Sequence, residues 1–187
     1  MSIELVYETH AITTDNEAGI ATGWLPGVLS AAGHDSAREL GARRRDDGIA
    51  TVYVSDLARA VETARIAFAD APLPIVVDAR LRECNYGRMN GMPRAQLDLE
   101  RASHLDVPWP GGESYRDVVA RTASFLEDVA HGADGIRVLV IAHSANEWAL
   151  EHLLRGADLP ARVAAGMTWQ PGWEFVVPRD WRAPVRR

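Results

Sequence analysis

Residues 3–10, IELVYETH, form a short apolar run that ends in a histidine, and residues 138–143, VLVIAH, repeat this arrangement near the other end of the chain. A third apolar run, residues 49–54 (IATVYV), is followed by SDLARA, which carries Arg59. Such runs are typical of buried strands, and side chains that follow the strands of an open α/β sheet meet at one edge, where ligand sites form. We therefore expect the imidazoles of His10 and His143 and the guanidinium of Arg59 to converge on one anion.

Strands and helices alternate along the chain, which predicts an α/β fold: a three-layer αβα sandwich around a mostly parallel central sheet. The expected strands are residues 3–9, 51–54, 74–77, 137–142 and 174–177. The expected helices are residues 32–45, 94–101 and 145–154, a helix that carries Arg59 and has Asp56 as its N-cap, and a helix that Ser114 caps and that runs to about residue 130.

No Gly/Ser/Pro-rich stretch divides the 187 residues, of which 47% are hydrophobic, so we expect one domain over residues 1–187. Residues 84–112 hold several prolines and glycines with little periodicity, and they read as an insertion that roofs a site. We call them the roof segment. The tail after Pro178 is expected to be exposed.

The formal net charge is −6, and all 20 basic residues are arginine, without a basic stripe of the kind that nucleic-acid binding requires. The lone cysteine, Cys84, fits a reducing compartment and is expected to be buried. No basic, apolar leader and no apolar run near the ~20 residues that cross a bilayer are present. These features predict a cytoplasmic enzyme domain that binds neither nucleic acid nor membrane; a homodimer remains an open alternative to a monomer.

A series of motifs resembles the histidine phosphatase superfamily, also called the phosphoglycerate mutase-like family. That family opens with Arg-His-Gly after its first strand, and here Thr9-His10-Ala11 stands in this place, with Asn16 at the usual downstream spacing. Further matches, in the correct order, are residues 29–33 (LSAAG), 55–64 (SDLARAVETA), 81–83 (LRE), 110–114 (PGGES) and 142–143 (AH). The resemblance covers roughly residues 3 to 155 and implies a phosphoglycerate mutase-like fold.

The resemblance also implies a mechanism, in which a neutral imidazole attacks phosphorus and a phosphohistidine on His10 is hydrolysed by water. Arg59 and His143 would stabilise the phosphoryl oxygens, and Glu83 would protonate the leaving oxygen. Neither a metal nor a cofactor is implied. The other residues expected to contact substrate or phosphate are Asn16, Thr9, Ser144 and Arg82.

Departures from the family pattern concentrate at this site. Thr9 replaces an arginine, and loss of a bidentate guanidinium contact weakens transition-state binding by about two to four orders of magnitude unless another group replaces it. Arg82 or Arg88 is the expected replacement. Strand alternation places Glu8 on the same face as His10, so a carboxylate is expected near the site. Trp148 stands where the family often has an arginine. These departures suggest a small phosphate ester that carries a basic or neutral group.

Three functional classes are compatible with these residues. The first is a metal-independent phosphomonoesterase that acts on a small phosphorylated metabolite; a mutase is a less favoured member of this class because the roof segment is short. The second is an enzyme of the same fold that uses His10 or Glu83 for proton transfer, which Thr9 and Glu8 favour. The third is a binding protein that has lost phosphatase activity.

For some residues a structural or surface position is the alternative to a role at the site. Trp109 is expected either to line the substrate pocket or to pack under a loop. Surface positions are expected for the remaining histidines, which are His34, His104, His131 and His152.

Overall fold

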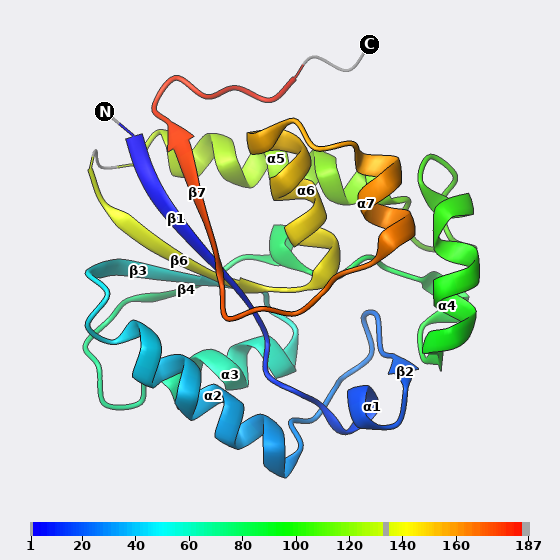
Figure 1. Ribbon diagram of the computed structural model, residues 1–187, viewed down its shortest axis with the longest axis horizontal. Helices are drawn as coiled ribbons and strands as arrows, with labels where there is room; N and C mark the ends of the chain where they lie inside the picture. Colours follow the sequence, from blue (N-terminus) through cyan, green and yellow to red (C-terminus); the bar gives the residue numbers. More distant parts are fainter. Residues whose placement is uncertain (1, 133–134, 185–187) are drawn as a thin grey trace.

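The computed structural model describes residues 2–132 and 135–184. A five-stranded sheet with the order β4-β3-β6-β1-β7 forms the middle of the structure (Figure 1). Its strands are β1 (Ser2–Thr9), β3 (Ile49–Val54), β4 (Ile75–Val77), β6 (Arg137–Ala142) and β7 (Trp173–Pro178). The pairs β4-β3, β3-β6 and β6-β1 are parallel, and β7 is antiparallel to β1. The expectation of a mostly parallel sheet is confirmed.

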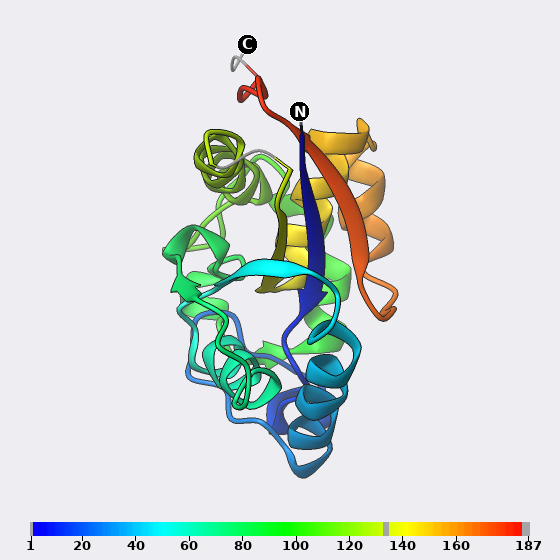
Figure 2. The same ribbon diagram turned by 90° about the vertical axis from the view of Figure 1, so that its left-hand side faces the viewer.

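Helices cover both faces of this sheet, as Figure 2 shows edge-on. On one face lie α2 (Ala31–Arg44) and α3 (Ala58–Ala67), and on the other lie α5 (Tyr115–Ala130) and α6 (Ser144–Arg155), with α7 (Leu159–Ala165) packed against α6. The alternation of β1 fits this arrangement: Leu5 packs with Phe125 of α5, whereas Val6 packs with Leu40 of α2.

Short elements surround the carboxyl ends of the strands. They are α1 (Thr14–Glu17), β2 (Ile20–Ala21), β5 (Met92–Pro93), α4 (Arg94–Glu100) and the 3₁₀ turns η1 (Ala79–Leu81), η2 (Gly87–Met89) and η3 (Arg101–His104). Strands β2 and β5 pair antiparallel, so the loop after His10 is joined to the roof segment. The sequence predicted α4 within the roof segment. It did not predict α1, β2 and β5, which are too short to show a period, or α7, which has the same length as α4.

Two expected helix caps had different outcomes. Ser114 caps α5 as expected, and its side chain and that of Asp117 form a reciprocal capping box. Asp56 was expected to cap α3, and this was wrong: Leu57 is the N-cap residue, without a side-chain hydrogen bond. The Asp56 carboxylate binds Arg82 instead.

Trp109 is buried, stacks on His104 and contacts Tyr86 edge to face, so it packs within the roof segment, to which all three residues belong. Cys84 is buried, as expected. Within the part of the chain that the structure describes, no helix is both long enough and apolar enough to cross a membrane.

Helices α2 and α3 approach each other closely at Gly41. A Cβ atom added there would lie 2.1 Å from the carbonyl oxygen of Ala67 and 2.8 Å from its carbonyl carbon. The obstacle is backbone, which cannot rotate away. The position of α2 against α3, and with it the setting of Arg59 at the start of α3, therefore depends on a glycine at this position.

We expect Gly41→Ala to lower the free energy of unfolding by ~1–3 kcal/mol, because the overlap forces the two helices apart. Helix propensity alone predicts the opposite sign, a gain of about 1 kcal/mol. Urea unfolding of the variant beside Ala42→Ser, an exposed change in the same turn, measures the difference. A stabilised Gly41→Ala variant would contradict the close approach.

Candidate active site

His10, Arg59 and His143 meet at the carboxyl edge of the sheet. His10 follows β1, His143 follows β6, and Arg59 lies in the first turn of α3, just after β3. The imidazole centroids are 5.0 Å apart. Arg59 Nε lies 3.3 Å from His10 Nε2, and Arg59 Nη2 lies 3.4 Å from His143 Nδ1. The structure thus brings together the three side chains that the sequence predicted to converge.

Arg59 is buried, with 2% of its surface exposed. Its guanidinium also donates to the carbonyl oxygens of Gly23 at 2.8 Å and Leu25 at 3.3 Å. Gly23 has a φ of +56°, and a Cβ there would lie 2.0 Å from Asn90 Oδ1, so only glycine fits the turn that supplies this acceptor. The Thr63 hydroxyl donates to the Arg59 carbonyl and accepts from the Ala11 amide, which ties α3 to the loop after His10.

His10 is oriented as a nucleophile. Its Nδ1 lies 2.7 Å from the carbonyl oxygen of Ala11, which can only accept, so Nδ1 carries the proton and the Nε2 lone pair faces Arg59. Burial, and then the Arg59 cation, lower the pKa of His10 from 6.5 to about 3. The imidazole is therefore neutral at ordinary pH, which is the form that attacks phosphorus.

His143 is held from both sides. Its Nε2 lies 2.9 Å from Ser55 Oγ, and its carbonyl oxygen accepts from the buried Tyr7 hydroxyl. Burial, followed by the charges of Arg59 and His10, lowers the pKa of His143 well below its usual value. Helix α6 begins at Ser144, directly after this imidazole, so the partial positive charge of its N-terminus adds to a local preference for an anion.

Glu83 is the acidic group of the site. Its Oε1 accepts from the Cys84 amide at 2.7 Å. Burial raises the pKa of Glu83, against the opposing influence of that hydrogen bond and of Arg59 and Arg121. A raised pKa keeps a larger share of this carboxyl protonated, which suits a proton donor.

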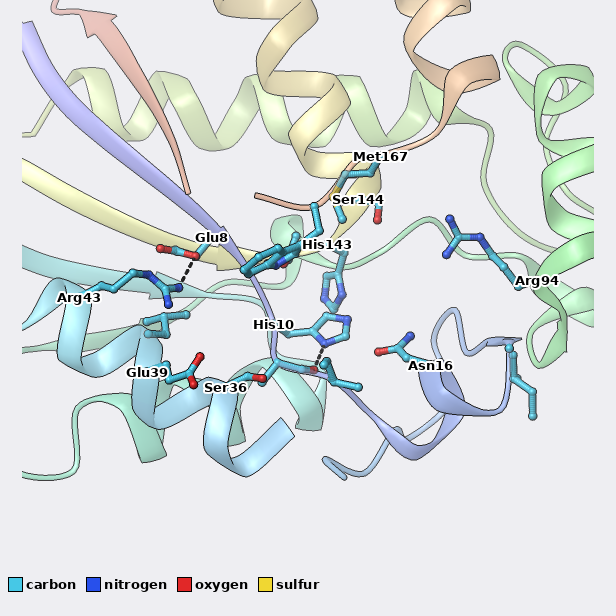
Figure 3. A pocket seen from close by; sticks show the side chains of 17 residues that line it. Glu8, His10, Asn16, Ser36, Glu39, Arg43, Arg94, His143, Ser144 and Met167 are labelled. Atoms are coloured by element: carbon cyan, nitrogen blue, oxygen red, sulfur yellow. Dashed lines mark hydrogen bonds and ion pairs between the residues drawn. The ribbon is translucent and has the colours of Figure 1, made fainter. Parts of the chain in front are cut away.

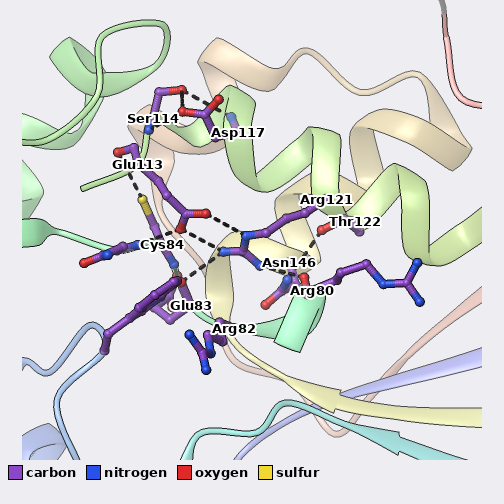
Figure 4. Close-up of polar contacts among 12 residues, drawn as sticks. Arg80, Arg82, Glu83, Cys84, Glu113, Ser114, Asp117, Arg121, Thr122 and Asn146 are labelled. Carbon is purple, nitrogen blue, oxygen red and sulfur yellow. Dashed lines mark hydrogen bonds and ion pairs between the residues drawn. The ribbon is translucent and has the colours of Figure 1, made fainter. Parts of the chain in front are cut away.

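The backbone of Glu83 is fixed by a network that the sequence did not predict (Figure 4). Arg121 of α5 donates to the carbonyl oxygens of Arg80 at 2.6 Å and Glu83 at 3.0 Å, and it binds the Glu113 carboxylate at 3.0 Å. The Trp24 indole donates to the same Glu83 carbonyl at 2.7 Å. Glu113 lies in the PGGES motif, but Arg121 is one of several arginines in an amphipathic helix and carries no distinguishing sequence signal.

Two adjoining cavities open over His10. The smaller, of about 80 Å³, is lined by Arg59, Glu83 and Trp148 among others. The larger, of about 430 Å³, is lined by residues that include Thr9 and His143 (Figure 3). Five residues contribute to the lining of both cavities: His10, Asn16, Ile20, Arg94 and Ser144. Of the predicted contact residues, Asn16, Thr9 and Ser144 therefore face the site.

Arg82 was expected to replace the arginine that is missing at Thr9, and this was wrong. Its Nε donates to Asp56 at 2.7 Å and its guanidinium lies 4.4 Å from the Trp24 ring centroid, so it lines neither cavity. The exposed Arg88 lines neither cavity either. The guanidinium that reaches both cavities belongs to Arg94 of α4, which sequence reasoning missed because a single arginine in a short helix carries no motif.

Glu8 lines the larger cavity, on the face that strand alternation predicted. It is not a free carboxylate, because Arg44 binds it at 2.8 Å and Arg43 at 3.2 Å. Glu8 therefore does not support the predicted preference for a phosphate ester that carries a basic or neutral group.

A mostly parallel sheet with two imidazoles and a guanidinium at its carboxyl edge defines an α/β protein with a candidate anion site. Residues 9–166 match the model of the histidine phosphatase superfamily (branch 1). The chain therefore belongs to this family.

Similar proteins include mutases and phosphatases. The chain is 33% identical, over 81% of its length and 80% of the relative's, to a 2,3-bisphosphoglycerate-dependent phosphoglycerate mutase of Methylobacterium sp. (strain 4-46). A mycobacterial glucosyl-3-phosphoglycerate phosphatase, solved with VO3, superimposes with a TM-score of 0.78 at 28% identity, over 88% of each chain. A phosphoglycerate mutase structure from Bacillus anthracis str. Sterne, at 22% identity and a TM-score of 0.72 over 83% of this chain and 81% of that one, supports the fold.

The lowered pKa of His10 predicts a pH dependence of stability. Between pH 6.5 and about pH 3, the unfolded chain binds a proton at this histidine and the folded protein does not. Acidification through this pH range therefore favours unfolding. We expect the free energy of unfolding of the wild type to fall more steeply between about pH 7 and pH 5 than that of His10→Gln. Urea titrations at several pH values test this, and parallel curves for the two proteins would show that His10 is not buried as a neutral group.

Proposed function

We propose that this protein is a phosphomonoesterase that acts on a small phosphorylated metabolite through a phosphohistidine at His10. The observation that carries the proposal is the contact of Arg59 with both imidazoles, because it holds His10 Nε2 beside the guanidinium. A phosphate oxygen that accepts the Arg59 Nε–H in place of His10 frees the Nε2 lone pair for attack. The membership in the histidine phosphatase superfamily supports it.

In the first step, His10 Nε2 attacks phosphorus and the bond from phosphorus to the ester oxygen breaks. Arg59, the N-terminus of α6 and the Asn16 amide stabilise the equatorial oxygens, whose negative charge persists throughout the transfer. Glu83 gives its proton to the departing alkoxide, and the alcohol leaves. The bound dianion also favours a protonated His143, because it opposes the effect of Arg59.

In the second step, water attacks the phosphohistidine. Glu83, now ionised, removes a proton from this water, the bond from phosphorus to Nε2 breaks, and inorganic phosphate leaves. His10 returns to the neutral form, which burial and the Arg59 cation favour, with its remaining proton on Nδ1 donated to the Ala11 carbonyl. The cycle restores every proton to its starting position.

A phosphoglycerate mutase is the second candidate, and two observations favour it. Relatives at about one-third identity carry this name, and Arg94 and Arg101 both line the smaller cavity, where a second anionic group could be held. Both guanidiniums are, however, bound to the carboxylate of Asp98, which offsets part of their charge. Hydrolysis is therefore favoured over transfer to a second anionic substrate.

Removal of the nucleophile or of the guanidinium should have separable effects. We expect His10→Ala to abolish turnover of p-nitrophenyl phosphate. Arg59→Met should lower kcat/KM by about 10²–10⁴, since each charge-assisted hydrogen bond contributes roughly 1.5–3 kcal/mol. Equal residual rates in wild type and His10→Ala would exclude phosphoryl transfer to His10 and favour a different reaction or a binding role.

The acid role of Glu83 predicts a dependence on the leaving group. Glu83→Gln should slow hydrolysis of an alkyl phosphate by about 10²–10⁴, because the alkoxide needs a proton as it departs. With p-nitrophenyl phosphate, whose leaving group is stable as an anion, the first step should slow far less. Single-turnover rates for both esters provide the measurement. A uniform loss would point to a positioning role for this carboxyl.

A further inference from the structure

The larger cavity is the space available to the alcohol part of the ester, and this inference rests on the phosphomonoesterase function proposed above. The smaller cavity, of about 80 Å³, contains His10, Arg59 and Glu83 and has room for a phosphoryl group and little more. The larger cavity, of about 430 Å³, falls in the range of ordinary ligand sites. Since the two share the His10 boundary, an ester bound at the smaller cavity extends into the larger one.

Short side chains on both sides of His10 open this route. Thr9 and Ala11 both line the larger cavity. Beyond them the cavity continues along α2 and under the loop after α7, where Ser36, Glu39 and Trp169 line it. In Figure 3, Asn16 and Arg94 lie on one side of His10, and Ser36 and Glu39 lie on the other.

The charges along the cavity are unevenly paired. Arg43 and Arg94 each bind a carboxylate, Glu8 at 3.2 Å and Asp98 at 2.9 Å, respectively. Glu39 is exposed on α2, one helical turn before Arg43, and no hydrogen bond or ion pair joins it to any residue in the described ranges 2–132 and 135–184. Arg43 shares Glu8 with Arg44, which binds it at 2.8 Å, so Glu39 is the carboxylate on the α2 side of the cavity that stays open to a cationic ligand.

Trp169 adds a second feature that favours a cation. It is 62% exposed and lines the same cavity as Glu39. The face of a tryptophan ring attracts ammonium groups, and the combination of a carboxylate with an exposed indole binds a cationic nitrogen better than a neutral group of the same shape.

We propose that Glu39 and Trp169 form a specificity site for a cationic nitrogen on the alcohol part of the substrate, so that the protein prefers phosphomonoesters of amino alcohols over neutral esters of equal size. Glu39 thus takes the role that the sequence predicted for Glu8.

A pair of isosteric esters tests this proposal: choline phosphate and 3,3-dimethylbutyl phosphate, in which carbon replaces the charged nitrogen. The wild type should show the higher kcat/KM for choline phosphate. Glu39→Gln should reduce this preference by about threefold to fivefold, mainly through KM, with the neutral ester little changed. Trp169→Leu should reduce it as well, and added salt should weaken the preference of the wild type.

Asp35→Asn is the matched control, because it removes the same charge from the same helix at a residue that does not line the cavity. It should leave the preference unchanged. Equal kcat/KM values for the two esters in the wild type, or an unchanged preference in Glu39→Gln, would overturn the specificity site. If neither ester is hydrolysed in a manner that depends on His10, the proposed phosphomonoesterase function fails instead, so the two failures are distinguishable.

Discussion

The buried guanidinium of Arg59 is the constraint on which the rest of the site depends. It is surrounded by two carbonyl oxygens and two imidazole nitrogens, and within the described residues no carboxylate oxygen lies in hydrogen-bond contact with it. A buried cation whose hydrogen bonds all go to neutral acceptors favours an incoming anion. Burial, together with the same cation, lowers the pKa of both imidazoles and so keeps His10 neutral and nucleophilic.

The fold places this cation where it can act. Strands β3, β6 and β1 are neighbours in the sheet, so the residues that follow them come together. Arg59 and His143 are in contact although 84 positions separate them in the sequence. Close backbone contacts fix the surroundings, such as the approach of α2 to α3 at Gly41. The acid is positioned from another layer, since Arg121 of α5 holds the backbone at Glu83. Nucleophile, cation and acid thus depend on three separate parts of the structure.

The sequence predicted the features that follow from periodicity and from ordered motifs. The parallel strands, the main helices and the convergence of His10, Arg59 and His143 belong to this group. It failed where a side chain had a choice of partners: Asp56 binds Arg82 instead of capping α3, and Glu8 is neutralised by Arg43 and Arg44. The roles of Arg94, Arg121 and Glu39 depend on which long side chains meet across elements. Strand and helix periods do not determine such contacts.

A covalent phosphate on His10 is the central claim, and rapid acid-free quenching after mixing the protein with a phosphomonoester tests it most directly. Mass spectrometry of the quenched protein should find one phosphoryl group, acid-labile and attached to the peptide that contains His10, and it should form and decay during turnover. Release of phosphate with no adduct at His10, or an adduct on another residue, would contradict the account.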